Sequence, residues 1–280
     1  MKIIIHGGFF SEASADEKMR KDKQEAIKAI VTLAYGHLKN HTALEAAIYA
    51  VSLLEDNPLF NAGMGSMIQS DGKIRMSASL MDGQSHKFTG VINIEDVKNP
   101  IFVAEKLLAY EDKVLGGEGA ITFAREQGYE EYSTETPERR AEYEKKKASK
   151  GTGTVGCVAF DKDGNIAAAT STGGKGFEMI GRISDSATVA GNYANKFCGV
   201  SCTGVGEDIV ANATAAKIVT RVTDGMAIKE AFDKTFSELK EYDGFCGAIA
   251  IDHQGNIYHQ DSEPAMVFAS YDGEEYQIFK

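Results

Sequence analysis

The junction Gly153-Thr154, where a strongly charged segment meets the apolar run TVGCVAF, carries residues that could do covalent chemistry. Cleavage of the peptide bond between these two residues would leave a threonine hydroxyl beside its own free α-amino group. Such an amine has a pKa of about 7.7 to 8 and serves as a general base without any histidine. Glycine before the threonine would also permit the strained backbone that an N-to-O acyl shift needs. A threonine that opens a strand is most often only a β-former, so the junction alone leaves both interpretations open.

Other catalytic patterns are absent or lie in the wrong context. The run GTGTVG at residues 151–156 fits the glycine pattern of dinucleotide-binding loops, but those loops follow a strand and open a helix. Here a charged segment precedes the run and a strand-like segment follows it. The sequence has no GxSxG elbow and no P-loop, and neither His253 nor His259 lies in a recognisable triad context. We interpret His6 and the remaining histidines as structural or surface residues.

The composition indicates a globular protein and excludes several kinds of partner. The 280 residues are 43% hydrophobic and 25% charged, which suits one globular domain or two closely packed halves. The net charge of -11 leaves no excess of Lys and Arg to neutralise phosphates, so we expect neither nucleic acid nor an anionic membrane as partner. No stretch approaches the roughly 20 apolar residues of a membrane span. The N-terminal MKIIIHGGFF has too short an apolar run for a signal peptide.

The four cysteines form no CxxC pair and no zinc-like pattern with the six histidines. We therefore expect reduced, mostly buried thiols in a cytoplasmic protein.

The elements that must position the junction are strands and helices in blocks. Apolar spacing predicts helices at residues 15–39, 42–54, 100–110 and 119–127, and strands at 2–5, 73–80 and 88–94. Between residues 130 and 150, twelve of twenty-one residues are charged, which predicts a solvated, poorly ordered linker. Beyond it, β-type runs occupy 154–160, 165–172, 187–194 and 196–203, helices 210–223 and 225–240, and closing strands 246–280. This order predicts sheets covered by helices, an α/β or α+β layer fold.

Longer stretches give the junction a specific context. The segment GTVGCVAFDKDGNIAAATSTGGKGFEMIGRISDS, followed by SCTGVGE, resembles the plant-type asparaginase and isoaspartyl peptidase family of N-terminal-nucleophile threonine hydrolases. IHGG, LEDNPLFNAGMGS, ASLMDG, KNPI and GEGAITFAREQGY resemble the same family in the same order. The match runs from about residue 3 to residue 210 and weakens toward the C-terminus.

The resemblance implies roles for single residues. Thr154 would be the nucleophile, exposed by self-cleavage after Gly153, and Thr172 would orient it from within hydrogen-bond reach. Arg182 and Asp185 would bind the α-carboxylate and the α-amino group of the substrate, since a bidentate cation and an anion together recognise a zwitterion.

Three further assignments follow from the same resemblance. Thr203 and the backbone amide of Gly204 would form the oxyanion hole, where preorganised donors stabilise developing negative charge. Asn61 is similar to the family's active-site asparagine and would assist there. The loop at residues 56–67 resembles a structural sodium-binding loop, while neither a metal nor an organic cofactor would take part in the reaction.

The implied reaction has four steps: self-cleavage, attack of Thr154 on the side-chain amide of asparagine or on a β-peptide carbonyl, release of ammonia or an amino acid, and hydrolysis of the β-aspartyl enzyme. The implied fold is α+β, a four-layer αββα sandwich. One folded domain would contain an α chain, residues 1–153 with the charged linker at about 130–153, and a β chain, residues 154–280. The precursors are usually dimeric, so we expect a homodimer of αβ protomers.

The sequence departs from the family pattern at several places. The C-terminal DSEPAMVFAS differs from the family's usual asparagine- and glycine-containing ending, and no role is assigned there. Phe9 and Phe10 follow the HGG run where small residues are usual, residues 208–211 lack the common arginine, and Ser186-Ala187 replaces Ser-Pro. These changes bear on substrate choice more than on the chemistry. Two alternatives stay open: a glycosylasparaginase-like hydrolase with a similar threonine start, and a processing-deficient paralogue with a binding or regulatory role.

Overall fold

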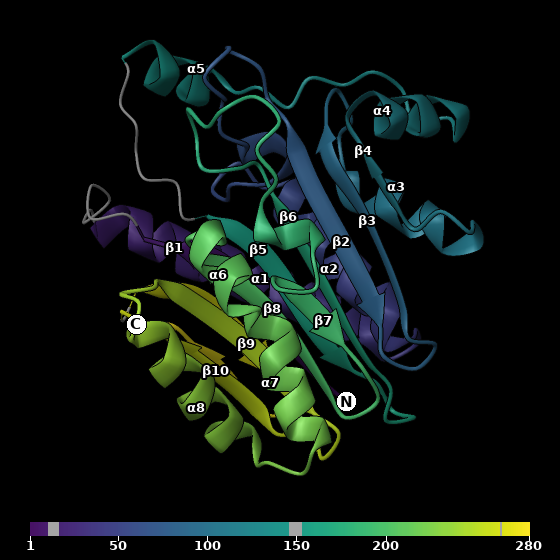
Figure 1. Ribbon diagram of the computed structural model, residues 1–280, viewed down its shortest axis with the longest axis vertical. Coiled ribbons are helices and arrows are strands. Elements are labelled where there is room, and N and C mark those ends of the chain that lie inside the picture. The colour runs from purple at the N-terminus through teal and green to yellow at the C-terminus, as the bar shows by residue number, and fades with distance from the viewer. Residues whose placement is uncertain (11–16, 146–152, 264) are drawn as a thin grey trace.

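Two β-sheets form the centre of the molecule (Figure 1). The computed structural model describes residues 1–10, 17–145, 153–263 and 265–280. Part of the predicted linker, residues 146–150, and the first two residues of the GTGTVG run lie outside the described residues. The strands of the larger sheet are β1 (Lys2–Phe9), β2 (Met76–Asp82), β3 (Lys87–Ile94), β4 (Val114–Gly116), β5 (Thr154–Phe160), β6 (Ile166–Thr172), β11 (Met266–Tyr271) and β12 (Tyr276–Ile278). The strands of the smaller sheet are β7 (Asn192–Ala194), β8 (Cys198–Gly204), β9 (Cys246–Asp252) and β10 (Ile257–Asp261).

The strand order puts the start of β5 in the middle of the larger sheet. Within the described residues this sheet runs β12-β11-β1-β5-β6-β2-β3-β4, and the smaller sheet runs β10-β9-β8-β7. Neighbouring strands are antiparallel except β3 and β4, which are parallel. Largely antiparallel sheets with helices grouped on their faces define an α+β fold and not an α/β one.

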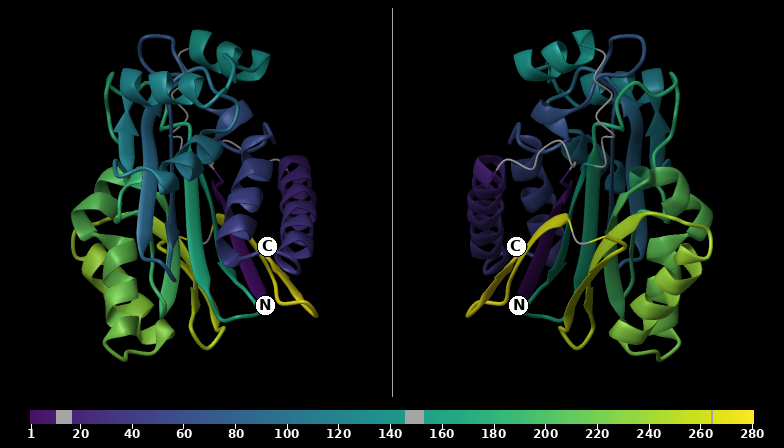
Figure 2. Two further views of the ribbon diagram at one scale, coloured as in Figure 1. Left: turned by 90° about the vertical axis from the view of Figure 1, so that its right-hand side faces the viewer. Right: turned by 90° about the vertical axis from the view of Figure 1, so that its left-hand side faces the viewer.

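Helices cover the faces of both sheets. They are α1 (Glu17–Leu38), α2 (Ala43–Glu55), α3 (Pro100–Lys106), α4 (Gly117–Glu126), α5 (Pro137–Glu144), α6 (Gly206–Asn212), α7 (Thr214–Thr223) and α8 (Ile228–Lys240), with short 3-10 turns η2 (Gly63–Gly65), η3 (Leu107–Ala109) and η4 (Asp185–Ala187). Helix α1 packs on β1 and β11, α2 packs on β5 and β6, and α7 packs on β8. Figure 2 shows α1 and α2 on one side of the strands and α7 and α8 on the other.

Side chains alternate between the two faces of β5, as the period of a strand requires. The Cβ position of Gly199 on β8 lies 3.0 Å from Val158 Cγ1, so Val158 points toward the smaller sheet. Thr154, four residues earlier, lies on the same face. Ser171 on β6 points the other way, because its hydroxyl donates to Glu55 Oε1 on α2 at 2.6 Å. The nucleophile candidate therefore lies between the two sheets.

Three sequence-based predictions of elements are corrected by the structure. The charged linker includes α5, a helix that starts with a Thr136 cap accepting from Arg139 N and with Pro137 in its first turn. The predicted helix at 210–223 is two helices, because Ala213 between them has a left-handed φ of 50°. The predicted β run at 187–194 contains only the short β7, preceded by η4.

Two further observations concern the whole chain. All four cysteines, Cys157, Cys198, Cys202 and Cys246, are buried and unpaired by disulfides. Among the residues that the structure describes, no helix is both long and apolar enough to cross a membrane.

Candidate active site

Thr154 is the first residue of β5 and is almost fully buried, with 6% of its surface exposed. In the β5–β6 ladder it is directly opposite Thr172. The Thr154 hydroxyl donates to Thr172 Oγ1 at 3.3 Å, and Thr172 Oγ1 also accepts from the Gly174 amide at 3.2 Å. The ladder register therefore brings the predicted nucleophile and its predicted orienting residue together.

The smaller sheet contributes the other side of the site. The backbone N–H of Thr154 donates to Thr203 Oγ1 on β8 at 3.4 Å. Gly204 follows with a φ of 136°, a conformation that residues with a side chain rarely adopt. The backbone at residue 204 therefore has a conformation that glycine allows. This residue directly follows Thr203, which accepts from the Thr154 N–H.

Asn61 is fixed beside the residue that precedes Thr154. Its Oδ1 accepts from Met67 N at 2.9 Å, its Nδ2 donates to the Gly174 carbonyl at 2.6 Å, and its backbone oxygen accepts from Gly173 N at 2.9 Å. The Cβ position of Gly153 lies 2.8 Å from Asn61 Cβ. Asn61 thus connects the loop after α2 with the loop after β6, at the junction itself.

Arg182 and Asp185 approach each other at the N-terminus of α6. The Cβ position of Gly206 lies 2.6 Å from Arg182 Nη2 and 2.9 Å from Asp185 Oδ1, so a side chain at residue 206 would displace them. Residue 206 stands only three residues after Thr203, which contacts Thr154. The structure therefore places the predicted cation and anion together, against the turn between β8 and α6 that follows the predicted oxyanion hole.

Asp185 is buried, and no partner for its Oδ2 atom is found among the described residues. Burial raises the pKa of this carboxyl to about 7, against the opposing effect of the nearby Arg182 charge. A buried carboxyl with an unsatisfied oxygen is costly for folding and is well suited to a cationic ligand.

Glu207 is a partner of Arg182 that sequence reasoning missed. Arg182 Nε and Nη2 donate to its two carboxylate oxygens at 3.1 and 3.0 Å, and Lys175 Nζ donates to Oε1 at 3.0 Å. Burial opposes ionisation of Glu207, but the bonds from Arg182 and Lys175 outweigh it and hold its pKa at about 2. Two cations thus share one carboxylate, and the bidentate bond fixes the plane of the guanidinium. No signal in the sequence connected residues 182 and 207.

His6 is the second residue that sequence reasoning left without a role. It is fully buried, its Nδ1 lies 3.0 Å from the Thr154 carbonyl oxygen and its Nε2 lies 2.8 Å from Ser201 Oγ. Burial lowers its pKa to about 3, so the ring is neutral. Only the β1–β5 register reveals the contact, since 148 residues separate His6 from Thr154.

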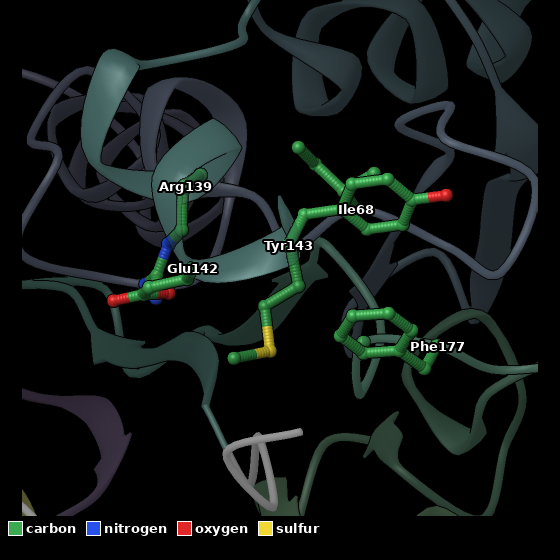
Figure 3. Close-up of a pocket in the computed structure, with 7 residues that line it drawn as sticks. Ile68, Arg139, Glu142, Tyr143 and Phe177 are labelled. Atoms are coloured by element: carbon green, nitrogen blue, oxygen red, sulfur yellow. The ribbon is translucent and has the colours of Figure 1, made fainter. Parts of the chain in front are cut away.

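The predicted linker takes part in the surroundings of the site through α5. Arg139 Nε donates to the Gly65 carbonyl at 2.8 Å, and the Tyr143 ring stacks on Phe177 with 5.1 Å between ring centroids. Figure 3 shows these side chains around a small pocket, whose lining residues are Met67, Ile68, Arg139, Glu142, Tyr143, Gly176 and Phe177. Thr154 does not line this pocket. Helix α5 therefore packs against both loops that converge on Asn61.

Comparison with known proteins agrees with this arrangement. The family model described as Asparaginase matches residues 1–279. The chain is 44% identical to an isoaspartyl peptidase/L-asparaginase of Synechocystis sp., over 97% of this chain and 88% of that protein. It is 37% identical to a plant-type L-asparaginase of Pyrococcus horikoshii, over 95% of each chain, and 36% identical to an isoaspartyl peptidase of Escherichia coli, over 91% and 88%. The chain belongs to this asparaginase family, which confirms the resemblance seen in its sequence.

Proposed function

We propose that this protein is a self-cleaving threonine hydrolase that acts on the side-chain amide of L-asparagine and on β-aspartyl (isoaspartyl) dipeptides. The observation that carries the proposal is the position of Thr154 at the start of a strand, with Oγ1 on Thr172 and N on Thr203. The names of its relatives, isoaspartyl peptidase and L-asparaginase, support both substrates.

Self-cleavage would begin with attack of Thr154 Oγ1 on the Gly153 carbonyl carbon. The C–N bond then breaks, the proton lost by the hydroxyl passes to the departing nitrogen, and an ester joins Gly153 to the threonine oxygen. Water hydrolyses this ester and leaves a free α-amino group on Thr154. The close packing of Asn61 against Gly153 supports a role for its side chain at this bond.

In turnover, the freed amine takes the proton of the Thr154 hydroxyl while Oγ1 bonds to the substrate's side-chain carbonyl carbon. Thr203 and the Gly204 amide stabilise the resulting oxyanion. The C–N bond breaks, and the protonated amine returns its proton to the departing nitrogen, which leaves as ammonia or as an amino acid. Water then hydrolyses the β-aspartyl ester and regenerates the threonine. These steps require only groups of the chain and water.

The substrate's zwitterionic end is assigned to Arg182 and Asp185. The buried Asp185 carboxyl, whose Oδ1 lies beside Arg182 at Gly206, supports an ammonium ligand, and the oriented Arg182 guanidinium supports a carboxylate ligand. With its α-carboxylate and α-amino group bound, the substrate would have its β-carbonyl held in place relative to Thr154. This positioning supplies the proximity contribution to catalysis.

A structural sodium ion is proposed for the loop at residues 56–67. The Cβ position of Gly65 lies 2.7 Å from the Pro58 carbonyl oxygen, and the Phe60 carbonyl is closer still. Carbonyl oxygens are the ligands that hard cations take, so the residues present fit such an ion. It would brace the loop that carries Asn61 and would take no part in the bond-breaking steps.

We further propose a four-layer αββα sandwich of the N-terminal-nucleophile type, with residues 1–153 as the α chain and 154–280 as the β chain. The packing of the two sheets on each other, through β5 with β8 and β6 with β8, supports it. Because β5 pairs with β1 on one side and with β6 on the other, cleavage before Thr154 would leave both chains in one sheet and one domain.

A homodimer of αβ protomers in the cytoplasm completes the proposal. Large apolar side chains are exposed in the segment between β6 and β7 and on α6, namely Met179, Ile180, Ile183, Val189 and Val210. Helix α6 packs against η4 of that segment, and exposed apolar groups near one another favour association. Four buried free thiols support a reducing compartment.

A substrate assay tests the proposed activity. Purified protein incubated with L-asparagine should release ammonia, and with β-aspartyl-leucine should release leucine, whereas Thr154→Ala should do neither. Release of aspartate only from N-acetylglucosaminyl-asparagine would favour the glycosylasparaginase-like alternative. A folded protein that binds L-aspartate but hydrolyses none of the three would favour the processing-deficient alternative.

A further inference from the structure

His6 lies where the pairing between β1 and β5 stops. The ladder ends with His6 opposite Gly156, and β1 has no paired residue for Val155 or Thr154. At that point the His6 side chain reaches the Thr154 carbonyl oxygen, with Nδ1 at 3.0 Å. A carbonyl oxygen only accepts hydrogen bonds, so Nδ1 carries the proton and donates. The ring therefore takes the place of a backbone partner at the first residue of β5.

The other ring nitrogen is held in a buried polar network. In a neutral ring with its proton on Nδ1, Nε2 is an acceptor, and Ser201 Oγ lies 2.8 Å from it. Ser201 Oγ in turn lies 2.6 Å from Thr170 Oγ1. All three side chains are completely buried. A fully satisfied buried network of this kind rigidifies its members, so the ring has one orientation and one tautomer.

Gly156 makes room for this network. A Cβ at residue 156 would overlap Ser201 Oγ and His6 Nε2. On the face of β5 that carries Thr154, residue 156 therefore has no side chain. His6 and Ser201 meet in the space that this leaves. A polar contact between His6 and Ser201 occupies interior space that an apolar side chain at residue 156 could fill. Core packing alone would not favour this choice.

The nitrogen, the hydroxyl and the carbonyl of Thr154 each form a hydrogen bond with a different strand. Its nitrogen donates to Thr203 on β8, its hydroxyl donates to Thr172 on β6, and its carbonyl accepts from His6 on β1. Before cleavage, the peptide bond to Gly153 also restrains the nitrogen. After cleavage that restraint is gone, and the contacts of the nitrogen with Thr203 and of the carbonyl with His6 limit rotation about the Cα–C bond of Thr154.

We infer that His6 is a positioning residue, which holds the nucleophile threonine by its carbonyl oxygen so that the freed α-amine stays directed at Oγ1. The inference rests on the proposed function, because it concerns the mature form of the same site. It requires the Nδ1–H donor and not merely a side chain of similar volume. It also requires that turnover depend on His6 more than self-cleavage does.

Two substitutions separate the donor from the volume. The amide nitrogen of His6→Asn occupies roughly the position of Nδ1 and can donate to the Thr154 carbonyl. The amide of His6→Gln extends to the position of Nε2 and Ser201 and leaves the Thr154 carbonyl without its donor. Self-cleavage is followed by intact mass, and kcat and KM for L-asparagine are measured on the cleaved fractions, with thermal unfolding of each variant as a measure of folding.

The expected result is a split between the two variants. His6→Gln should lose about 100-fold in kcat, the size expected for a nucleophile displaced by about 1 Å, with KM changed less than about threefold. His6→Asn should keep kcat within about tenfold of the wild type, and both should still cleave. Equal kcat losses in the two variants, or wild-type kcat in His6→Gln, would overturn the inference. If the wild type itself neither cleaves nor hydrolyses, the proposed function has failed instead.

A measurement on the unmodified chain covers the case in which a variant does not fold. Long-range proton–nitrogen NMR of histidine-labelled wild type reports which ring nitrogen carries the proton. The His6 signals should show the Nδ1–H tautomer throughout pH 5 to 9, before and after cleavage. An Nε2–H tautomer, or a charged ring in that range, would overturn the inference because neither leaves the described donor-and-acceptor arrangement intact.

Discussion

Thr154 and Thr172 are opposite each other in the β5–β6 ladder, and their hydroxyl oxygens lie 3.3 Å apart. The pair lies at the end of two strands, where Thr172 also accepts from the Gly174 amide of the following loop. A strand register thus fixes the spacing between the proposed nucleophile and its neighbour. Because a one-residue slip would move every side chain to the other face, this spacing is as well determined as the sheet itself.

Removal of the Thr172 hydroxyl should slow catalysis without unfolding the protein. Thr172→Val keeps the shape but cannot accept from Thr154, so kcat for L-asparagine should fall by about 100-fold or more, in the range of a lost positioned hydrogen-bond group. Thr172→Ser keeps the hydroxyl and should stay within about tenfold of the wild type. Steady-state kinetics on cleaved protein measure both. Equal activity of the valine and serine variants would show that the 3.3 Å contact has no role in turnover.

Replacement of Arg182 by lysine should separate substrate binding from self-cleavage. Lysine keeps the charge but loses the planar fork that now binds Glu207 through two nitrogens. Loss of a charge-assisted bond costs about 1.5–3 kcal/mol, so KM for L-asparagine should rise by roughly 10- to 100-fold. Self-cleavage, which involves no free substrate, should proceed at the wild-type rate. An unchanged KM would remove Arg182 from the carboxylate site.

Binding of L-aspartate, the proposed product, should release protons below neutral pH. Burial raises the pKa of Asp185 to about 7, and an ammonium ligand favours its ionised form. Below pH 7 the carboxyl must therefore lose a proton on binding, and above pH 7 it is already ionised. Affinity should fall as pH drops from 7 to 5.5 and level off above pH 8.

Calorimetry in buffers of different ionisation enthalpy counts the released protons. At pH 6 the wild type should release close to one proton more than Asp185→Asn does. The asparagine variant is the control for protons that come from the α-amino group of Thr154. Equal proton release by the two proteins would contradict the assignment of Asp185 to the ammonium.

An added methyl group at residue 156 should destabilise the fold. A Cβ there would overlap Ser201 Oγ and His6 Nε2, and insertion of bulk into a packed interior costs typically 1–3 kcal/mol. The matched control is Gly36→Ala in α1, where nothing lies within 4 Å of the Cβ position. That change should stabilise the protein by roughly 0.5–1 kcal/mol, because alanine is the better helix former. Urea unfolding measures both, and a Gly156→Ala variant as stable as the wild type would refute the overlap.

The sequence predicts most elements because their patterns are local. The helix at 42–54 is α2, which begins after a Thr42 cap with a full capping box, and the run TVGCVAF is β5 over its whole length. Helix α5 was missed because charge density outweighed two start signals, the Thr136 cap and Pro137. The break at Ala213 was missed because a left-handed φ in an apolar, helix-periodic segment has no sequence signature.

The candidate site residues also divide into those that the sequence predicts and those that it does not. Thr172, Arg182 and Asp185 lie in one continuous stretch whose motifs resemble a known family, so their proximity to the junction was predicted. His6 and Glu207 were not, because each contact depends on the pairing of strands or loops far apart in sequence. Glu55 illustrates the limit further: its burial raises the pKa of the carboxyl to about 8, yet in the sequence it is an ordinary helix-terminal glutamate.

Intact-protein mass spectrometry tests the central claim most directly, that Thr154 becomes an N-terminal nucleophile. Purified wild type and Thr154→Ala are held for several days at neutral pH and their masses are followed. We expect the wild type to yield a fragment beginning at Thr154, while the alanine variant stays whole. A wild type that remains one chain, in a form that unfolds cooperatively and is therefore folded, would contradict it.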